Sequence, residues 1–120
     1  MKLYHEFLQE HYHAPRNSTP IPHPTFEVTH SNRSCGDYIT ITGIIENNRL
    51  TQIYQYSSGC VISTATGSIL SEFCKGKTVS EIIAITPEHI QELIKLPLGP
   101  TRLQCALLPL HALIAGINNA

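Results

Sequence analysis

The stretch CGDYITITGIIENNRLTQIYQYSSGC, residues 35–60, decides the fold, and it begins and ends with a cysteine. Isoleucine and threonine alternate after Tyr38, as a half-buried antiparallel strand requires. We therefore predict strands over Tyr38–Glu46 and Leu50–Ser57. Asn47-Asn48 lies between them and predicts a tight turn, because asparagine tolerates the left-handed backbone conformation.

Outward from this hairpin, the sequence predicts one more strand and several helices. Phe26–Asn32 is a third strand-like run, and residues 2–12 have the apolar spacing of a short helix. After Cys60, the apolar residues Ile62, Ala65, Ile69 and Phe73 form one helical stripe that ends before Gly76. Thr78 and Thr86-Pro87 carry the signals of two further helix starts.

These elements predict an α+β fold with an N-terminal helix, a three-stranded antiparallel sheet and helices packed on one face. A chain of 120 residues is long enough for one domain but too short for two, so we expect a single domain over residues 1–120. Four prolines between positions 15 and 24 exclude regular structure there. We interpret residues 14–24 as a flexible, proline-rich arm.

The last helix is expected to begin near Cys105 or Ala106. Pro109 follows closely, and proline is best tolerated within the first turn because it lacks the N–H group that a helix interior uses. This placement puts Cys105 at a helix N-terminus. Cys60 also precedes a predicted helix, and unpaired N–H groups at such positions favour a thiolate.

Composition excludes several classes of function. Eight basic residues stand against nine acidic ones with no basic run, so nucleic-acid binding is not expected. The chain has no apolar stretch of membrane-spanning length, and its first residues lack the apolar centre of a signal peptide. We expect a cytoplasmic protein, in which four cysteines favour metal binding or thiol chemistry over disulfides.

A metal site is predicted from three cysteines and the only aspartate. Cys35 and Asp37 project to the same side of an extended segment, and Gly36 between them leaves room for an inorganic group. With Cys60 and Cys105 they form a set of three sulfurs and one oxygen, which suits Zn²⁺ or iron bound to sulfide.

Two simpler explanations of the cysteines carry less weight. A closed structural zinc site usually has paired Cys-x-x-Cys motifs, and this chain has none. Cys74 is excluded from the site, since a lone helical cysteine is more often a small packing residue than a ligand.

Five motifs follow one another along nearly the whole chain. They are His11-Tyr12-His13-Ala14-Pro15-Arg16-Asn17, Cys35-Gly36-Asp37, Gly59-Cys60, Lys75-Gly76-Lys77-Thr78-Val79, and Cys105 followed by an apolar helix. In this order and at these separations they resemble the IscU/NifU-like family of iron–sulfur cluster assembly proteins. Two histidines, His11 and His13, fall in the first motif, although residues of a surface helix would explain them equally well.

The resemblance implies an IscU/SufE-like architecture and a scaffold function rather than an enzyme. Such a scaffold accepts sulfur from a cysteine desulfurase, assembles a transient [2Fe–2S] cluster and passes it to acceptor apo-proteins or cluster carriers. Cys35, Asp37, Cys60 and Cys105 would hold the cluster, or Zn²⁺ in the isolated protein. Cys105 is the first candidate for the persulfide acceptor and Cys35 the second.

The chain also departs from the family pattern. Gln104 stands where the IscU branch has a histidine, and this feature resembles the SufU branch, which holds Zn²⁺ with three cysteines and the aspartate. The insertion usual in SufU-type chains between the second and third cysteines is missing. Residues 96–102 only partly resemble the segment that engages an Hsp70-type chaperone, so that partnership has weak support.

Two alternatives to the scaffold therefore remain open. One is a zinc-dependent sulfur acceptor, that is, a SufU-like sulfurtransferase partner of a desulfurase. The other is a metal-stabilised interaction module without transfer chemistry.

Overall fold

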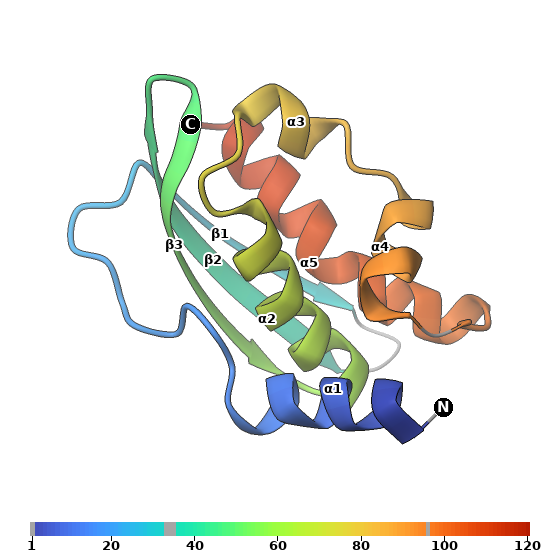
Figure 1. The fold of residues 1–120 in the computed structure, drawn as a ribbon. Helices are drawn as coiled ribbons and strands as arrows, with labels where there is room; N and C mark the ends of the chain where they lie inside the picture. Colours follow the sequence, from blue (N-terminus) through green and yellow to red (C-terminus); the bar gives the residue numbers. More distant parts are fainter. Residues whose placement is uncertain (1, 33–35, 96) are drawn as a thin grey trace.

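The computed structural model describes residues 2–32, 36–95 and 97–120. Within them, three antiparallel strands form a sheet in the order β1-β2-β3, and helices α2 and α5 cover one face of it (Figure 1). The predicted α+β architecture is confirmed. The elements are α1 (Lys2–His13), β1 (Phe26–Asn32), β2 (Asp37–Glu46), β3 (Arg49–Ser58), α2 (Val61–Cys74), α3 (Val79–Ile83), α4 (Pro87–Ile94) and α5 (Pro100–Asn118).

The first residues of β2 follow the alternation predicted from the sequence, but Thr42, which it sets on the solvent side, is buried. Ile39 and Ile41 are 1% and 2% exposed, and both belong to the hydrophobic core. Tyr38, the residue before Ile39 in the same strand, is exposed to solvent. Asn47 and Asn48 form the turn with φ angles of 53° and 63°, in the left-handed region. The hairpin is therefore determined by local sequence.

Helix α2 is buried on nearly all sides, which corrects the single apolar stripe predicted for it. Every residue from Ser63 to Ser71 is buried, whereas Phe73 of the predicted stripe is exposed. The helix contacts α1, α5 and β3, so it has no broad solvent face. Gly67 allows this close packing: a Cβ atom there would lie 3.0 Å from the Ile39 Cδ1 atom of β2.

The predicted start of the last helix is wrong. Helix α5 begins at Pro100, with Gly99 as its N-cap, and Pro109 lies inside it. Gly99-Pro100 supplies a good start because proline suits the first helical position. The missing N–H of Pro109 costs a hydrogen bond, but Pro109 and its neighbours Leu108 and Leu110 are buried in the core. Packing along the whole helix thus overrides the local preference.

The first residues of the predicted arm are fixed to the rest of the fold. The backbone N–H of Gln55 donates to the Asn17 carbonyl at 2.8 Å, and Asn17 Nδ2 donates to Ser71 Oγ at 3.0 Å. Residues 14–24 contain no helix or strand, as predicted. Flexibility in the remainder of the arm stays a prediction.

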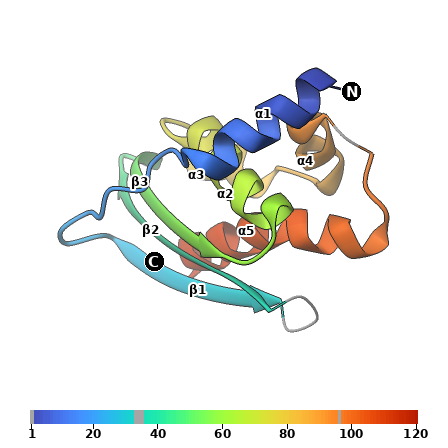
Figure 2. The same cartoon turned by 90° about the horizontal axis from the view of Figure 1, so that it is seen from below.

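His11 is buried, contrary to its explanation as a surface residue. Its Nδ1 atom lies 2.7 Å from Ser68 Oγ on α2, and the same oxygen accepts the Arg16 backbone N–H at 2.8 Å. The Ser68 oxygen can accept two hydrogen bonds as well as donate one, so either His11 or Ser68 can donate in this pair, depending on the imidazole tautomer. Figure 2 shows the result: α1 lies against α2 on the side away from β1.

No helix in the part of the chain that the structure describes has both the length and the apolar character needed to cross a membrane.

The burial of His11 predicts a pH-dependent stability. Burial, aided by the nearby Arg16 charge, lowers the His11 pKa below 6.5, and Glu72 and Glu10 oppose this shift. The unfolded chain then binds a proton more readily than the folded one. The free energy of unfolding should therefore fall as the pH drops below about 6.5 and level off once folded His11 is protonated.

Urea unfolding across this pH range measures the effect. His11→Asn keeps a polar group near Ser68, but asparagine cannot titrate. The free energy of unfolding of this variant should therefore change less steeply with pH than that of the parent. His13→Asn, at an exposed histidine of the same helix, should leave the slope unchanged. Equal slopes in His11→Asn and the parent would contradict the assignment.

Candidate metal centre

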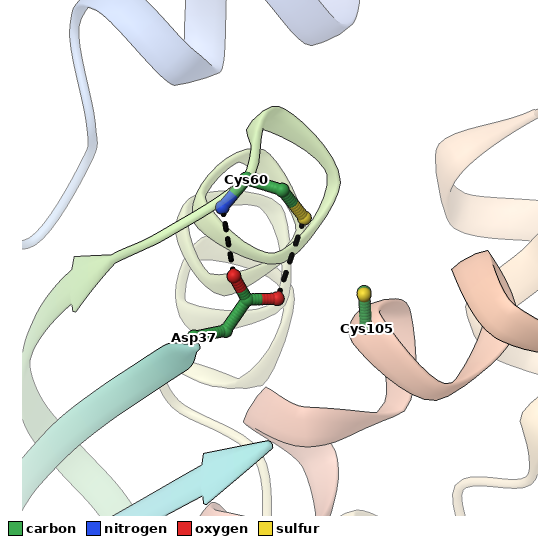
Figure 3. Close-up of side chains that lie close together, drawn as sticks. All are labelled: Asp37, Cys60 and Cys105. Atoms are coloured by element: carbon green, nitrogen blue, oxygen red, sulfur yellow. Dashed lines mark hydrogen bonds between the residues drawn. The ribbon is translucent and has the colours of Figure 1, made fainter. Parts of the chain in front are cut away.

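Three of the four predicted site residues converge at one end of the sheet. One ligand atom each from Asp37, Cys60 and Cys105 lies within 4.8 Å of the others. Figure 3 shows Asp37 at the start of β2, Cys60 just before α2 and Cys105 on α5. Cys35, the fourth predicted ligand, lies outside the described residues. Segments far apart in sequence thus supply two thiols and a carboxylate.

The Asp37 carboxylate is buried and makes two contacts with Cys60. It is 1% exposed, and its Oδ1 accepts the Cys60 backbone N–H at 2.9 Å. Cys60 Sγ lies 3.4 Å from the other oxygen, Oδ2, to which the thiol donates. Because the backbone holds Oδ1, Oδ2 is the oxygen that faces the thiols and the one available to a metal ion.

Gly59 makes this approach possible. Its φ angle is +143°, and a Cβ atom there would lie 2.1 Å from Asp37 Oδ1. No side chain fits at that distance, so the Gly59-Cys60 pair is required for the carboxylate to reach the Cys60 N–H. The Gly-Cys motif is explained by this contact.

Cys60 is the N-cap of α2, as predicted. Its backbone is extended, and its sulfur accepts the Ser63 N–H at 3.5 Å. Ser63 Oγ lies 3.6 Å from the same sulfur. A thiol therefore occupies the position usually taken by serine or aspartate. Ser63 was not predicted as part of the site, although its place three residues after Cys60, at the start of a predicted helix, was a usable signal.

Cys105 is not at a helix N-terminus, which corrects the prediction. It lies in the second turn of α5 and is 3% exposed. The Asn32 Nδ2 atom is 3.9 Å from its sulfur, a long but directed contact. Asn32 is the register partner of Asp37 across β1 and β2. This pairing places Asn32 near the site, and it was not predicted from the sequence.

Cys74 lies apart from this group, as predicted. It is completely buried, and burial raises the pKa of its thiol to about 12 against the weak opposite effect of Lys77. Such a thiol stays protonated and unreactive at neutral pH. Gln104 is exposed on α5, and among the described residues no histidine joins the ligand group.

The donor set fits a soft or borderline metal. Sulfur ligands select zinc and iron–sulfur centres over magnesium or calcium, and a single carboxylate oxygen is compatible with both of the former. Asp37 and Cys105 are enclosed while Cys60 is half-buried, so the set is open at the Cys60 side. Zn²⁺ bound there would be held by Cys60, Cys105 and Asp37 Oδ2.

Comparison with known proteins assigns the family. The model of the NifU-like N terminal domain matches residues 3–119. The chain belongs to this family. The resemblance predicted from the five motifs is therefore confirmed, and the match covers both ends of the described fold.

Relatives and solved structures agree with this assignment. Iron-sulfur cluster assembly scaffold protein IscU 1 of Archaeoglobus fulgidus is 32% identical over 111 residues, 92% of this chain and 72% of that protein. FiSufU of Fervidobacterium islandicum, described as a scaffold candidate for the SUF system, has a TM-score of 0.82 at 21% identity, covering 93% of this chain and 94% of that one. A NifU-like protein from Brucella abortus has a TM-score of 0.78 at 18% identity, covering 96% and 92%. The two structures support the fold alone.

The tight approach at Gly59 predicts a specific effect of Gly59→Ala. Gly76 also has a positive φ angle, +90°, but open space surrounds it, so Gly76→Ala measures backbone strain alone. We expect Gly76→Ala to cost about 1 kcal/mol of stability. Gly59→Ala should cost roughly 1–3 kcal/mol more, because the methyl group displaces the Asp37 carboxylate.

Thermal unfolding measures the stability difference, and the absorption of bound Co²⁺ reports the thiolate site. Gly59→Ala should weaken Co²⁺ binding and Gly76→Ala should not. Equal effects of the two substitutions on both measurements would contradict the role given to Gly59.

Proposed function

We propose that this chain is an iron–sulfur cluster assembly scaffold. It accepts sulfur from a cysteine desulfurase, assembles a transient [2Fe–2S] cluster and passes it to acceptor apo-proteins or cluster carriers. The observation that carries the proposal is the convergence of Asp37, Cys60 and Cys105 within 4.8 Å on a family fold. The name of the Archaeoglobus fulgidus relative, an iron-sulfur cluster assembly scaffold protein, supports it.

The ligands have different tasks in this function. Cys60 and Cys105 supply sulfur ligands from two helices, and Cys35 is proposed as the third thiolate. Asp37 supplies the one hard ligand, through Oδ2. A carboxylate is the most replaceable ligand in a thiolate-rich set, so it keeps the cargo exchangeable.

Sulfur acceptance is proposed at Cys105 first and at Cys35 second. Cys105 lies inside α5, so the unpaired N–H groups of a helix N-terminus do not favour its thiolate. The proposal now rests on its place beside Asp37 and Cys60 and on the family position that it occupies. A transferred sulfane sulfur there is shielded from solvent, because Cys105 is 3% exposed.

A second candidate function is a zinc-dependent sulfur acceptor. Gln104 replaces the histidine of the IscU branch, and its side chain is exposed rather than part of the ligand group. Among the described residues the ligand group consists of Cys60, Cys105 and Asp37, and with Cys35 added it would equal the ligand set of the SufU branch. A metal-stabilised interaction module is the remaining alternative and lacks transfer activity.

Substitution of Asp37 distinguishes the scaffold from the zinc-dependent acceptor. Asp37→Asn keeps an acceptor for the Cys60 N–H but removes the carboxylate, whereas Asp37→Ala removes both. If the protein is a scaffold, both variants should hold a reconstituted cluster longer and deliver it more slowly. If the protein is a zinc centre, both variants should bind zinc more weakly. The expected decrease is about 10- to 100-fold, the size of effect seen when a group that supports a metal ligand is removed.

Anaerobic reconstitution with iron, sulfide and a desulfurase measures cluster decay and transfer, and a chromogenic chelator measures zinc release. Only Asp37→Ala should also lose stability, by about 1–3 kcal/mol, because it leaves the Cys60 N–H of a half-buried residue without its side-chain acceptor. Variants that match the parent in both assays would remove Asp37 from the site. If the parent protein binds metal but neither takes up sulfur nor transfers a cluster, the metal-stabilised interaction module is the alternative that remains.

Sulfur from a desulfurase should be found on Cys105. Labelled cysteine as the substrate, followed by peptide mass spectrometry under non-reducing conditions, locates the persulfide. Cys74 provides the internal control, because its buried thiol with a pKa of about 12 should carry no label. Label found chiefly on Cys74 would contradict the assignment of the site residues. Label found chiefly on Cys35 would make Cys35 the first sulfur acceptor and Cys105 the second.

A further inference from the structure

The two edges of the sheet differ in how they are covered. Other segments of the chain pair with the β3 edge at two points: Leu50 N–H donates to the Lys77 carbonyl at 2.9 Å, and Gln55 N–H donates to the Asn17 carbonyl at 2.8 Å. Among the described residues, the backbone of Phe26–Ser31 in β1 bonds only to β2. Figure 2 shows β1 at the rim of the sheet. Such an edge can pair with another extended chain.

A groove begins where β1 ends and runs along α5. Its volume is about 350 Å³, and polar side chains stand around an apolar floor made by Leu107 and Leu108. The polar lining residues are Ser31, Asn32, Gln104 and His111. Amide, hydroxyl and imidazole groups of this kind hydrogen-bond peptide groups, and the leucines give an apolar contact for a side chain.

The groove lies beside Cys105, which is not one of its lining residues. Asn32 lines the groove and also places Nδ2 3.9 Å from the Cys105 sulfur. Leu108, another lining residue, lies one helical turn after Cys105. Since Cys105 is only 3% exposed, a sulfur donor must displace the side chains that cover it, and Asn32 is the lining residue in contact with its sulfur.

We propose that the β1 edge and this groove bind an extended, cysteine-bearing segment of the sulfur donor protein by β-strand addition. The inference rests on the proposed function and specifies how its sulfur arrives. In the transfer, the Cys105 thiolate attacks the outer sulfur of the donor persulfide. The new S–S bond forms as the old one breaks, the donor cysteine leaves as a thiolate, and no external oxidant or reductant is needed.

The continuity of edge and groove favours an extended peptide over a small thiol. A free thiol would use the groove but gain nothing from the seven-residue strand β1 beside it. A peptide gains main-chain hydrogen bonds along β1 and side-chain contacts in the groove, at the same time as it aims its cysteine at Cys105.

A synthetic peptide tests this without metal or desulfurase. The probe is an extended peptide of alternating valine and threonine that ends in a cysteine activated as its thionitrobenzoate mixed disulfide, and free cysteine activated in the same way is the comparison. We expect the peptide to modify Cys105 at least roughly tenfold faster, since one or two net hydrogen bonds account for that factor. Peptide mass spectrometry identifies the modified cysteine.

Two further measurements separate the alternatives. His111→Trp should fill the groove and abolish the preference for the peptide, whereas His23→Trp, at an exposed position of the arm, should not. The amides of β1 should gain protection from hydrogen exchange when the peptide binds. Equal rates of Cys105 modification by the peptide and by free cysteine would overturn the proposal, and so would unchanged hydrogen exchange in β1. Protection of the β1 amides without peptide, by pairing with a second copy of the chain, would overturn it as well.

The result is independent of the test for cluster assembly. A protein that assembles a cluster but shows no peptide preference would refute only the delivery route. A peptide preference without cluster assembly would refute only the scaffold.

Discussion

The contact between Asp37 and the Cys60 backbone fixes the geometry on which the site depends. It joins the first residue of β2 to the N-cap of α2, so that the sheet and its central helix meet with a defined separation. Gly59 permits the contact, and Gly67 permits the close packing of the same helix two turns later. A buried carboxylate is stable here because both oxygens have partners, as burial of a charge requires. The same interaction therefore stabilises the fold and aims a ligand.

Helix α2 extends this constraint through the molecule. Its serines bind neighbouring segments instead of facing water: Ser68 binds His11 and the Arg16 backbone, and Ser71 binds Asn17. The histidine, arginine and asparagine of the N-terminal motif thus attach α1 and the start of the arm to α2. A motif that resembles a functional signature has, in this structure, a structural role. It positions the helix whose first residue is adjacent to Cys60.

The hairpin could be predicted from sequence because strand alternation and the asparagine turn are local properties. Capping signals likewise predicted the starts of α3 and α4. Pro109 misled the prediction for α5, because the burial of the long helix compensates for a local cost that sequence alone overestimates. His11 and Ser63 were undervalued for a related reason, since their partners depend on tertiary packing or on the exact cap residue. The family motifs indicated the proposed ligands, whereas the Oδ1 contact and the Asn32 neighbour required coordinates.

The position of Cys105 changes how the proposed scaffold must work. Two of the proposed ligands, Asp37 and Cys105, are buried, and Cys60 is the most accessible of the three described ones. Because a backbone N–H holds Oδ1 whether or not Oδ2 binds a metal, loss of a cluster need not displace the carboxylate. The empty and loaded states can then share one arrangement of Asp37, which limits the reorganisation needed for each cycle. Ease of exchange would come from the weak carboxylate bond itself rather than from movement of the residue, and so release would depend on an acceptor thiol that competes for the same coordination position.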